Sequence, residues 1–276
     1  MDLEESIRAN DEVATPRSLR ARWSARACGA VLILLVLVPA IDLGISAIFY
    51  SHGLGFVWRN QPVPEAIHEA IQVLARLIGV ATLLGLVHTS GLTLWDRWKS
   101  RPSPDPVDIR AATLLTLGPR SWAFLFLGLV LGPGLIANVV LKDMWSRARP
   151  VHVEEFGGHQ YFSPPMVISN QCEKNCSFVA GDAAMGFYLQ IFAYVVARRL
   201  AGPLLIVGMA AGLSAGLLRI GMGAHFFSDV IYAGVFMTVT IAGLHAAMFA
   251  PKQTLDLWRR WTPWCDRQWP SRGGRP

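Results

Sequence analysis

The sequence has 276 residues, of which 53% are hydrophobic and only 16% are charged, with a formal net charge of +6. About a quarter of the residues of a soluble domain are charged, so this composition excludes an ordinary soluble globular protein. A helix needs about 20 apolar residues to cross the hydrocarbon core of a bilayer. We therefore expect an all-α, polytopic membrane protein with a bundle of six transmembrane helices, from six apolar runs around residues 28–50, 72–94, 121–141, 183–197, 203–218 and 230–250.

The first apolar run follows four arginines and resembles the start of a signal peptide. Its apolar part, from Ala27 to Tyr50, is longer than the roughly 7–15 residues of a signal-peptide core, and no small-residue cleavage site follows it. We expect a retained helix. The fourth and fifth runs are the shortest, and they span a membrane only if their polar ends lie at the interface.

The basic residues favour one orientation in the membrane. With the N-terminus in the cytoplasm, 18 Lys and Arg residues lie inside and 6 lie outside, as cytoplasmic loops prefer. The prediction is a cytoplasmic basic tail over 1–27, a six-helix membrane domain over 28–250 and a second cytoplasmic tail over 251–276. Attraction to anionic lipid explains the tails, and no aromatic-interleaved basic patch indicates a nucleic-acid partner.

Polar side chains begin the second helix. Glu65, Glu69, Gln72 and Arg76 recur at spacings of three and four, so they share one face. A charge that faces hydrocarbon is costly, and it usually pairs or faces a wet cavity. An Asp42–Arg76 pair is one expectation; the alternative is that Arg76 extends to the headgroups.

The four cysteines fall on two sides of the expected membrane domain. Cys28 and Cys265 lie on the cytoplasmic side and should be reduced. Cys172 and Cys176 lie in the long outer loop, where they form either a small disulfide or two free thiols, since spacing alone does not decide. Zinc is not favoured, because no second Cys/His pair follows at ligand spacing.

Three polar clusters share the outer side: the segment after helix three, the start of helix four and the link between helices five and six. The predicted site segments are therefore 142–182 and 219–229. Topology brings these charged and titratable residues to one membrane depth: Lys142, Arg147, Arg149, Asp182, Arg219, His225 and Asp229.

Such a set suits a bound phosphate. Neighbouring cations repel unless an anion lies between them, and Arg and Lys match phosphate oxygens. Gly181 begins helix four, and a helix N-terminus favours phosphate. His225 is the natural nucleophile or base, and Asp229, four residues later, could accept the imidazole N–H and fix its tautomer.

The three clusters resemble, in order, the three signatures of the type 2 phosphatidic acid phosphatase family. Lys142 is followed after six residues by Arg149-Pro150, the second signature corresponds to Ser177–Asp182, and Arg219, His225 and Asp229 have the spacing of the third. The resemblance covers helices three to six.

The resemblance implies a lipid phosphatase with its site on the periplasmic face of a bacterial inner membrane. It implies that Lys142, Arg149 and Arg219 bind phosphate, helped by Ser177 and the backbone N–H of Gly181. His225 would attack phosphorus to give a phosphohistidine, and Asp229 would orient it. It implies neither a metal nor another cofactor.

Three departures from the family pattern matter, and they lie at Ala180, Asp182 and Leu218. The second signature ends in Val179-Ala180-Gly181-Asp182 where the family has Pro-Ser-Gly-His, and Leu218 replaces a serine before Arg219. The family histidine is the general acid for the leaving group. Either Asp182 is protonated and takes that role, or the protein is a weakened relative. His152 or His159 could supply the proton instead, although both also fit as exposed loop histidines.

The substrate expected is an amphiphile whose phosphate lies at the outer face. The second signature resembles that of lipid A phosphatases within the family, so lipid A ranks narrowly first. Undecaprenyl pyrophosphate, phosphatidylglycerophosphate and phosphatidic acid are the alternatives. A lipid-phosphate-binding or transport protein is the competing class, although inverted repeats typical of transporters are not visible. Nothing in the pattern indicates an oligomeric state.

Overall fold

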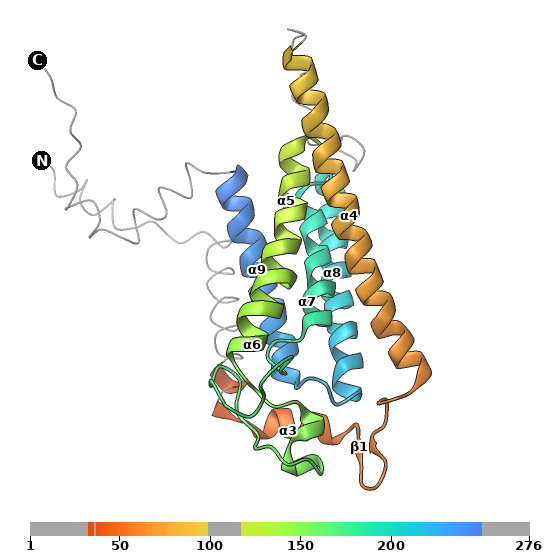
Figure 1. The fold of residues 1–276 in the computed structure, drawn as a ribbon, viewed down its shortest axis with the longest axis vertical. Coiled ribbons are helices and arrows are strands. Elements are labelled where there is room, and N and C mark those ends of the chain that lie inside the picture. The colour runs from red at the N-terminus through yellow and green to blue at the C-terminus, as the bar shows by residue number, and fades with distance from the viewer. Residues whose placement is uncertain (1–32, 36, 99–116, 250–276) are drawn as a thin grey trace, which may run out of the picture.

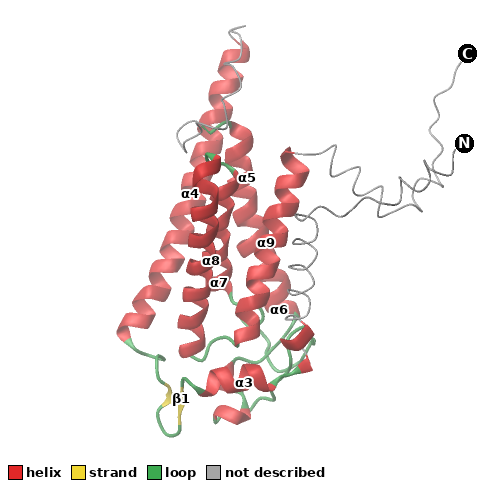
Figure 2. Ribbon diagram, turned by 180° about the vertical axis from the view of Figure 1, so that it is seen from behind, coloured by secondary structure: helices red, strands yellow, loops and turns green. Residues whose placement is uncertain are grey.

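The computed structural model describes residues 33–35, 37–98 and 117–249, and this part is predominantly helical (Figures 1 and 2). The predicted cytoplasmic tails, 1–27 and 251–276, lie outside the described residues, as does the start of the first predicted helix. Cys28 and Cys265 fall there as well.

Long helices run side by side along the molecule. They are α4 (Pro62–Trp98), α5 (Pro119–Leu129) with its π-helical continuation η2 (Val130–Leu141), α8 (Arg198–Gly221) and α9 (Phe227–Phe249). Within the described residues, four segments are long and apolar enough to cross a membrane: Pro62–Trp95, Pro119–Leu141, Arg199–Gly221 and Phe227–Phe249. The expectation of an all-α membrane protein is confirmed.

The other two predicted spans differ from expectation. The fourth consists of α7 (Gly181–Tyr188) followed by the 3-10 helix η5 (Leu189–Tyr194). Together they are about 24 Å long, shorter than the hydrocarbon core of about 30 Å. The expected continuous helix over 28–50 is interrupted at Val38 and Pro39, ahead of the short α3 (Ala40–Ala47), because proline disfavours a helical residue before it and removes an N–H.

The second predicted helix is longer than its apolar run. α4 has 37 residues, about 55 Å at 1.5 Å per residue, so its first turns extend past the apolar core of the bundle. Those turns carry the predicted polar stripe. The consequence is that a membrane-spanning helix also contributes side chains to the polar end of the molecule.

The short helix α7 lies in the middle of the bundle. All its residues from Asp182 to Tyr188 are buried, and a Cβ on Gly186 would lie 2.6 Å from the backbone of Gly212 in α8. Small residues at such contacts let helices approach closely. Because the backbone of α7 is packed against α8 and α9, its first turn is held rigidly.

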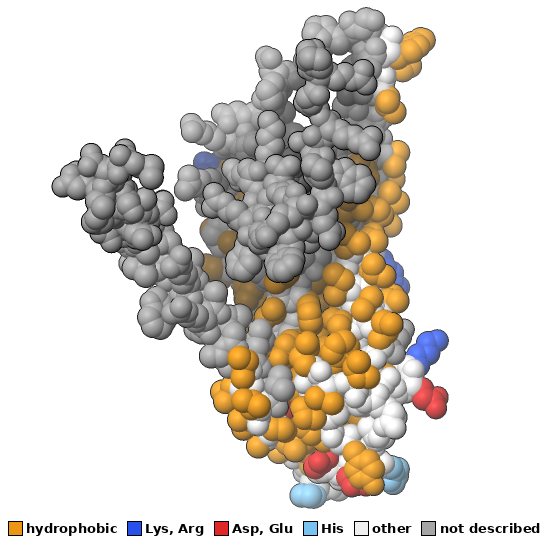
Figure 3. Space-filling view, turned by 90° about the vertical axis from the view of Figure 1, so that its left-hand side faces the viewer, with side chains coloured by type: hydrophobic (Ala, Val, Ile, Leu, Met, Phe, Trp, Pro, Cys, Tyr) orange, Lys and Arg blue, Asp and Glu red, His pale blue; other side chains and the backbone are white. Residues whose placement is uncertain are grey.

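Apolar side chains cover the outside of the bundle. Val73, Leu77 and Leu84 of α4 and Ile206 of α8 are exposed large hydrophobic residues, as a lipid-facing surface requires. Figure 3 shows this apolar surface on one side, with charged and histidine side chains gathered towards one end. That end is where α4 and α9 begin and α8 finishes (Figure 1).

Loops and short elements close this end. The hairpin of β1 (Tyr50–Ser51) and β2 (Gly55–Phe56) is antiparallel, and the outer loop contains α6 (Lys142–Met144), η3 (Pro150–His152) and η4 (Glu154–Phe156). Phe56, Phe156 and Phe226 belong to a small separate core. Gly223 between α8 and α9 has φ +67°, and a Cβ there would meet the Phe56 ring at 2.4 Å, so the turn that carries His225 requires glycine.

Candidate active site

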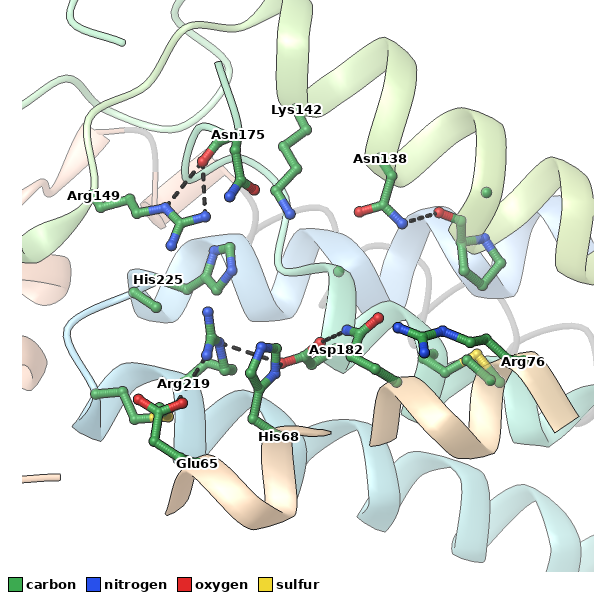
Figure 4. A pocket seen from close by; sticks show the side chains of 18 of the residues that line it. Glu65, His68, Arg76, Asn138, Lys142, Arg149, Asn175, Asp182, Arg219 and His225 are labelled. Atoms are coloured by element: carbon green, nitrogen blue, oxygen red, sulfur yellow. Dashed lines mark hydrogen bonds and ion pairs between the residues drawn. The ribbon is translucent and has the colours of Figure 1, made fainter. Parts of the chain in front are cut away.

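The closed end of the bundle contains a cavity of about 910 Å³. Its walls come from α4, α5, η2, α6, α7, the outer loop and the α8–α9 turn, and Figure 4 shows the side chains that line it. The predicted residues on its wall are Lys142, Arg149, Gly181, Asp182, Arg219 and His225. The convergence that topology predicted for these segments is therefore present.

Three cations face the cavity from three elements. Lys142 begins α6, Arg149 precedes η3, and Arg219 lies in the last turn of α8. Arg149 donates from Nε and Nη2 to the carbonyl oxygen of Asn175, at 3.0 and 2.8 Å. Burial, and next the charge of Arg219, lower the pKa of Arg149, which means that a bound anion would stabilise this cluster.

His225 lies in the turn between α8 and α9 and is 2% exposed. Its Nδ1–H donates to the carbonyl oxygen of Ser177 at 2.6 Å. A carbonyl oxygen only accepts, so the neutral ring carries its lone pair on Nε2. Burial lowers the pKa of His225 to about 4, against the opposing effect of Asp229, and the ring is neutral at pH 7.

The sequence predicts that Asp229 accepts the imidazole N–H of His225. In the structure the carboxylate is too far from the ring to accept this hydrogen bond directly. Its Oδ2 is 3.8 Å from His225 Nδ1, and it accepts instead from Ser177 Oγ at 2.5 Å and from the backbone N–H of Phe226 at 2.8 Å. Asp229 therefore holds the two segments on either side of the His225 ring. The reason is that the Ser177 carbonyl lies closer to Nδ1 than the carboxylate does.

Ser177 also differs from its expected role as a phosphate contact. It is fully buried, it is not on the cavity wall, and its hydroxyl is bonded to Asp229. Ser177 supports the His225 ring without lining the cavity. Its carbonyl oxygen accepts from the ring, and its hydroxyl donates to Asp229.

Arg147 is the residue that links this support to the rest of the outer loop. Its guanidinium, fully buried, donates to Asp229 Oδ1 at 2.5 Å, Asp42 Oδ2 at 2.8 Å and the Ser163 carbonyl oxygen at 2.8 Å. The Phe226 ring lies 4.4 Å below it. The expected Asp42–Arg76 pair is wrong, because Asp42 pairs with Arg147, whereas Arg76 is exposed on the cavity wall.

Asp182 is buried at the start of α7 and is held by side chains from α4. His68 Nδ1 lies 2.6 Å from its Oδ2, and Gln72 Nε2 donates to its Oδ1 at 2.6 Å. Arg219 Nε is 3.3 Å from Oδ2, an ion-pair distance without hydrogen-bond geometry. Gln72 belongs to the polar stripe predicted from the sequence, whereas His68 is not singled out there, although the two are four residues apart on one helix face.

Gly181 fits closely against the cavity wall. A Cβ at this position would lie 2.8 Å from Asn138 Oδ1 and 3.7 Å from Lys142 Nζ. The side chain of Asn138 is itself fixed by donating to the Pro133 carbonyl oxygen at 2.6 Å. Glycine at the helix start therefore keeps the first backbone N–H groups of α7 next to the cations.

Comparison with known proteins agrees with this arrangement. Residues 122–253 match the PAP2 superfamily. The match covers just under half of the chain. The matched segment contains the cations, His225 and Asp229, whereas the α4 residues that hold Asp182 lie outside it.

Three similar proteins carry the name lipid A 4′-phosphatase. That of Francisella tularensis subsp. novicida is 47% identical over 131 residues, which are 47% of this chain and 59% of the relative. Those of Rhizobium leguminosarum and Rhizobium etli are 35% and 36% identical over 118 residues, 43% of this chain and 51% and 46% of the relatives. The chain thus spans about half the length of the relatives it matches. No solved structure matches it.

The outer loop carries the two histidines considered as proton sources. His152 lines the cavity and His159 is exposed outside it. Burial lowers the pKa of His152. Cys172 and Cys176 form a disulfide, which resolves the alternative that their spacing left open, and the loop they close contains Asn175, the acceptor of Arg149.

Proposed function

We propose that the chain is a metal-independent membrane lipid phosphatase that acts on a phosphomonoester of lipid A, at the 4′ position. The observation that carries the proposal is the joint position of Lys142, Arg149, Arg219 and His225 on the wall of one cavity. The choice of lipid A and of the 4′-phosphate is supported by the name of three relatives.

The cavity suits an amphiphile. Its cationic end holds the three proposed phosphate ligands, and its other end has apolar walls that include Phe126, Leu129 and Pro133. A second, mostly apolar cavity of about 310 Å³ lies beyond Asp182, between α4, α7 and α8. A lipid phosphate therefore finds cations for its headgroup and apolar surface for its chains.

In the proposed first step, Nε2 of His225 attacks phosphorus, and the bond between phosphorus and the sugar oxygen breaks. Lys142, Arg149, Arg219 and the backbone N–H of Gly181 bind the phosphoryl oxygens, whose charge these donors stabilise. In the second step, water attacks the phosphohistidine and releases inorganic phosphate. Because the Ser177 carbonyl fixes the tautomer, the nucleophilic nitrogen faces away from its support.

The test is hydrolysis by purified protein in detergent. Bis-phosphorylated lipid A, undecaprenyl pyrophosphate, phosphatidylglycerophosphate and phosphatidic acid are supplied separately, and released phosphate is measured. We expect turnover of lipid A, with mass-spectrometric fragmentation that identifies loss at the 4′ position. If no lipid is hydrolysed while lipid A still binds, the protein is a lipid-phosphate-binding protein and the enzymatic proposal is wrong.

The nucleophile is tested with a matched pair of variants. His225→Asn should abolish turnover and the acid-labile ³²P label that a phosphohistidine gives after rapid quenching. His159→Gln, on the exposed part of the outer loop, should keep both. Label that persists in the His225→Asn variant would assign the nucleophile elsewhere.

We also propose that the cavity opens at the periplasmic face of a bacterial inner membrane, with both termini in the cytoplasm. The bias of Lys and Arg supports this orientation. Tyr161, 65% exposed beside the cavity end, offers a test. In a variant without other cysteines, Tyr161→Cys should react with a membrane-impermeant maleimide from the periplasm; labelling only after inner-membrane lysis would reverse the orientation.

A further inference from the structure

Hydrolysis of an alkyl phosphate requires a proton donor for the departing oxygen, and the cavity offers several candidates. The ionisable side chains on the wall that are not proposed phosphate ligands or the nucleophile are Arg59, Glu65, His68, Arg76, His152 and Asp182. Arginine does not give up its proton in proteins. The acid must come from the rest.

Asp182 is poorly suited to donate. Its Oδ1 accepts from the Gln72 amide and its Oδ2 faces the Arg219 guanidinium. The amide N–H and the guanidinium N–H groups only donate, so both carboxylate oxygens face donors. A carboxylate in that setting is a poor proton donor, and the geometry favours another side chain as the acid.

His68 has what Asp182 lacks. Its Nδ1–H donates to the Asp182 carboxylate at 2.6 Å, so the Nε2 edge of the ring is left for a substrate. The side chain is 27% exposed and lies on the cavity wall. The adjacent buried carboxylate fixes the orientation of the ring.

The position of His68 also fits the direction of the reaction. In phosphoryl transfer the attacking and departing atoms lie roughly in line, with the phosphoryl group between them. Figure 4 shows the His225 ring above the Arg219 guanidinium and the His68 ring beside it, next to Asp182. The three side chains line one cavity, so a phosphoryl group held by Arg219 lies within reach of both the proposed nucleophile and His68.

We propose that His68 is the general acid of the reaction and that Asp182 is its positioning residue; this inference rests on the proposed phosphatase function. When His225 attacks phosphorus, the electron pair of the breaking P–O bond passes to the sugar oxygen, which takes the proton from Nε2 of the His68 imidazolium. His68 is then neutral. It accepts a proton from the water that attacks the phosphohistidine, and the ring returns to its starting state.

The test compares two leaving groups. One substrate is lipid A, whose departing alkoxide needs a proton, and the other is a nitrophenyl phosphate that carries a fatty acyl chain, whose departing phenolate does not. His68→Asn keeps an amide that can donate to Asp182 but cannot supply a proton. We expect kcat for lipid A to fall about 10²–10³-fold, in the range of general acid catalysis, and kcat for the aryl phosphate to fall less than about 10-fold.

Two further variants separate acid catalysis from structure. Asp182→Asn should lower kcat for lipid A by about 10-fold or more, and it should lower kcat for the aryl phosphate less, as in His68→Asn. If His68→Asn is unstable, His68→Gln replaces it, and the same pattern is expected. His88→Asn, an exposed histidine on the same helix outside the cavity, is the matched control and should equal the parent protein on both substrates.

The outcomes are distinct. Equal losses on both substrates in the His68 variants, or no loss on lipid A, would overturn the assignment while the phosphatase function stands. A leaving-group-dependent loss in His152→Gln instead would move the acid to the outer loop and overturn it as well. If the parent protein hydrolyses neither substrate, the proposed function fails, and the role of His68 fails with it.

Discussion

Replacing Arg147 with methionine, which is apolar and of similar length, leaves two buried carboxylates without their shared cation. The guanidinium donates to Asp42 and Asp229, and all three side chains are at most 1% exposed. Removing one partner of a buried ion pair costs about 3–5 kcal/mol, because the remaining charge is buried without compensation.

The loss is moderated by bonds that survive. Asp42 still accepts from the backbone N–H and hydroxyl of Ser228, at 2.8 and 2.5 Å, and Asp229 keeps its bonds from Ser177 and Phe226. We therefore expect a destabilisation near the middle of the range, about 4 kcal/mol. For a chain of this size that lowers the thermal midpoint by roughly 8–16 °C.

The assay is thermal unfolding of the purified protein in detergent. Arg59→Met, an exposed arginine at the same end of the molecule, is the control and should shift the midpoint by less than about 2 °C. Adding Asp42→Asn to Arg147→Met removes one uncompensated charge and should recover part of the loss. An Arg147→Met midpoint equal to that of the control, or strict additivity in the double variant, would refute the proposed linkage.

Three other predictions concern the cavity. Because burial lowers the pKa of His225 from 6.5 to about 4, the free protein keeps its proposed nucleophile neutral as the pH falls through 6.5. The value of kcat/KM, corrected for ionisation of the substrate phosphate, should therefore fall through protonation of His225 only near pH 4, and an inflection at 6.5 would contradict this. Gly181→Ala should raise KM several-fold more than it lowers kcat, since its methyl group displaces Asn138 at the cavity wall. An unchanged KM would show that the Asn138 side chain moves aside without affecting substrate binding. Cys176→Ser opens the loop whose carbonyl fixes Arg149, so the Kd for inorganic phosphate should rise several-fold by calorimetry, and equal affinity would separate the disulfide from the site.

The convergence of the site could be predicted because it follows from topology alone. The apolar runs predict where each helix ends. Counting the predicted spans along the chain then places Lys142, Arg219 and His225 on the same side of the membrane. No side-chain detail is needed for that inference. The structure brings these residues to the wall of one cavity, even though the segment predicted as the fourth span is a short, buried helix.

The roles of the supporting residues could not be predicted in the same way. Ser177, Asp229 and Arg147 all lie in the segments that the sequence singled out, but spacing does not tell which atom faces the cavity. Asp229 is four residues after His225, the spacing expected of a direct partner, yet a backbone carbonyl from another segment lies closer. Main-chain acceptors leave no signature in residue types.

Asp182, which stands where the family pattern has histidine, shows why a motif considered alone can mislead. Taken by itself, an aspartate at the start of α7 either acts as an unusual acid or weakens the site. Its partner His68 is 114 residues away in sequence, on a helix outside the segment that matches the PAP2 superfamily. Only the length of α4, which extends its first turns to the cavity, brings the two together. The carboxylate then orients an imidazole in the cavity instead of facing the phosphate unpaired. A position that departs from the motif thereby becomes half of the proposed two-residue acid. Whether this site is active therefore depends on a helix that the motif does not include.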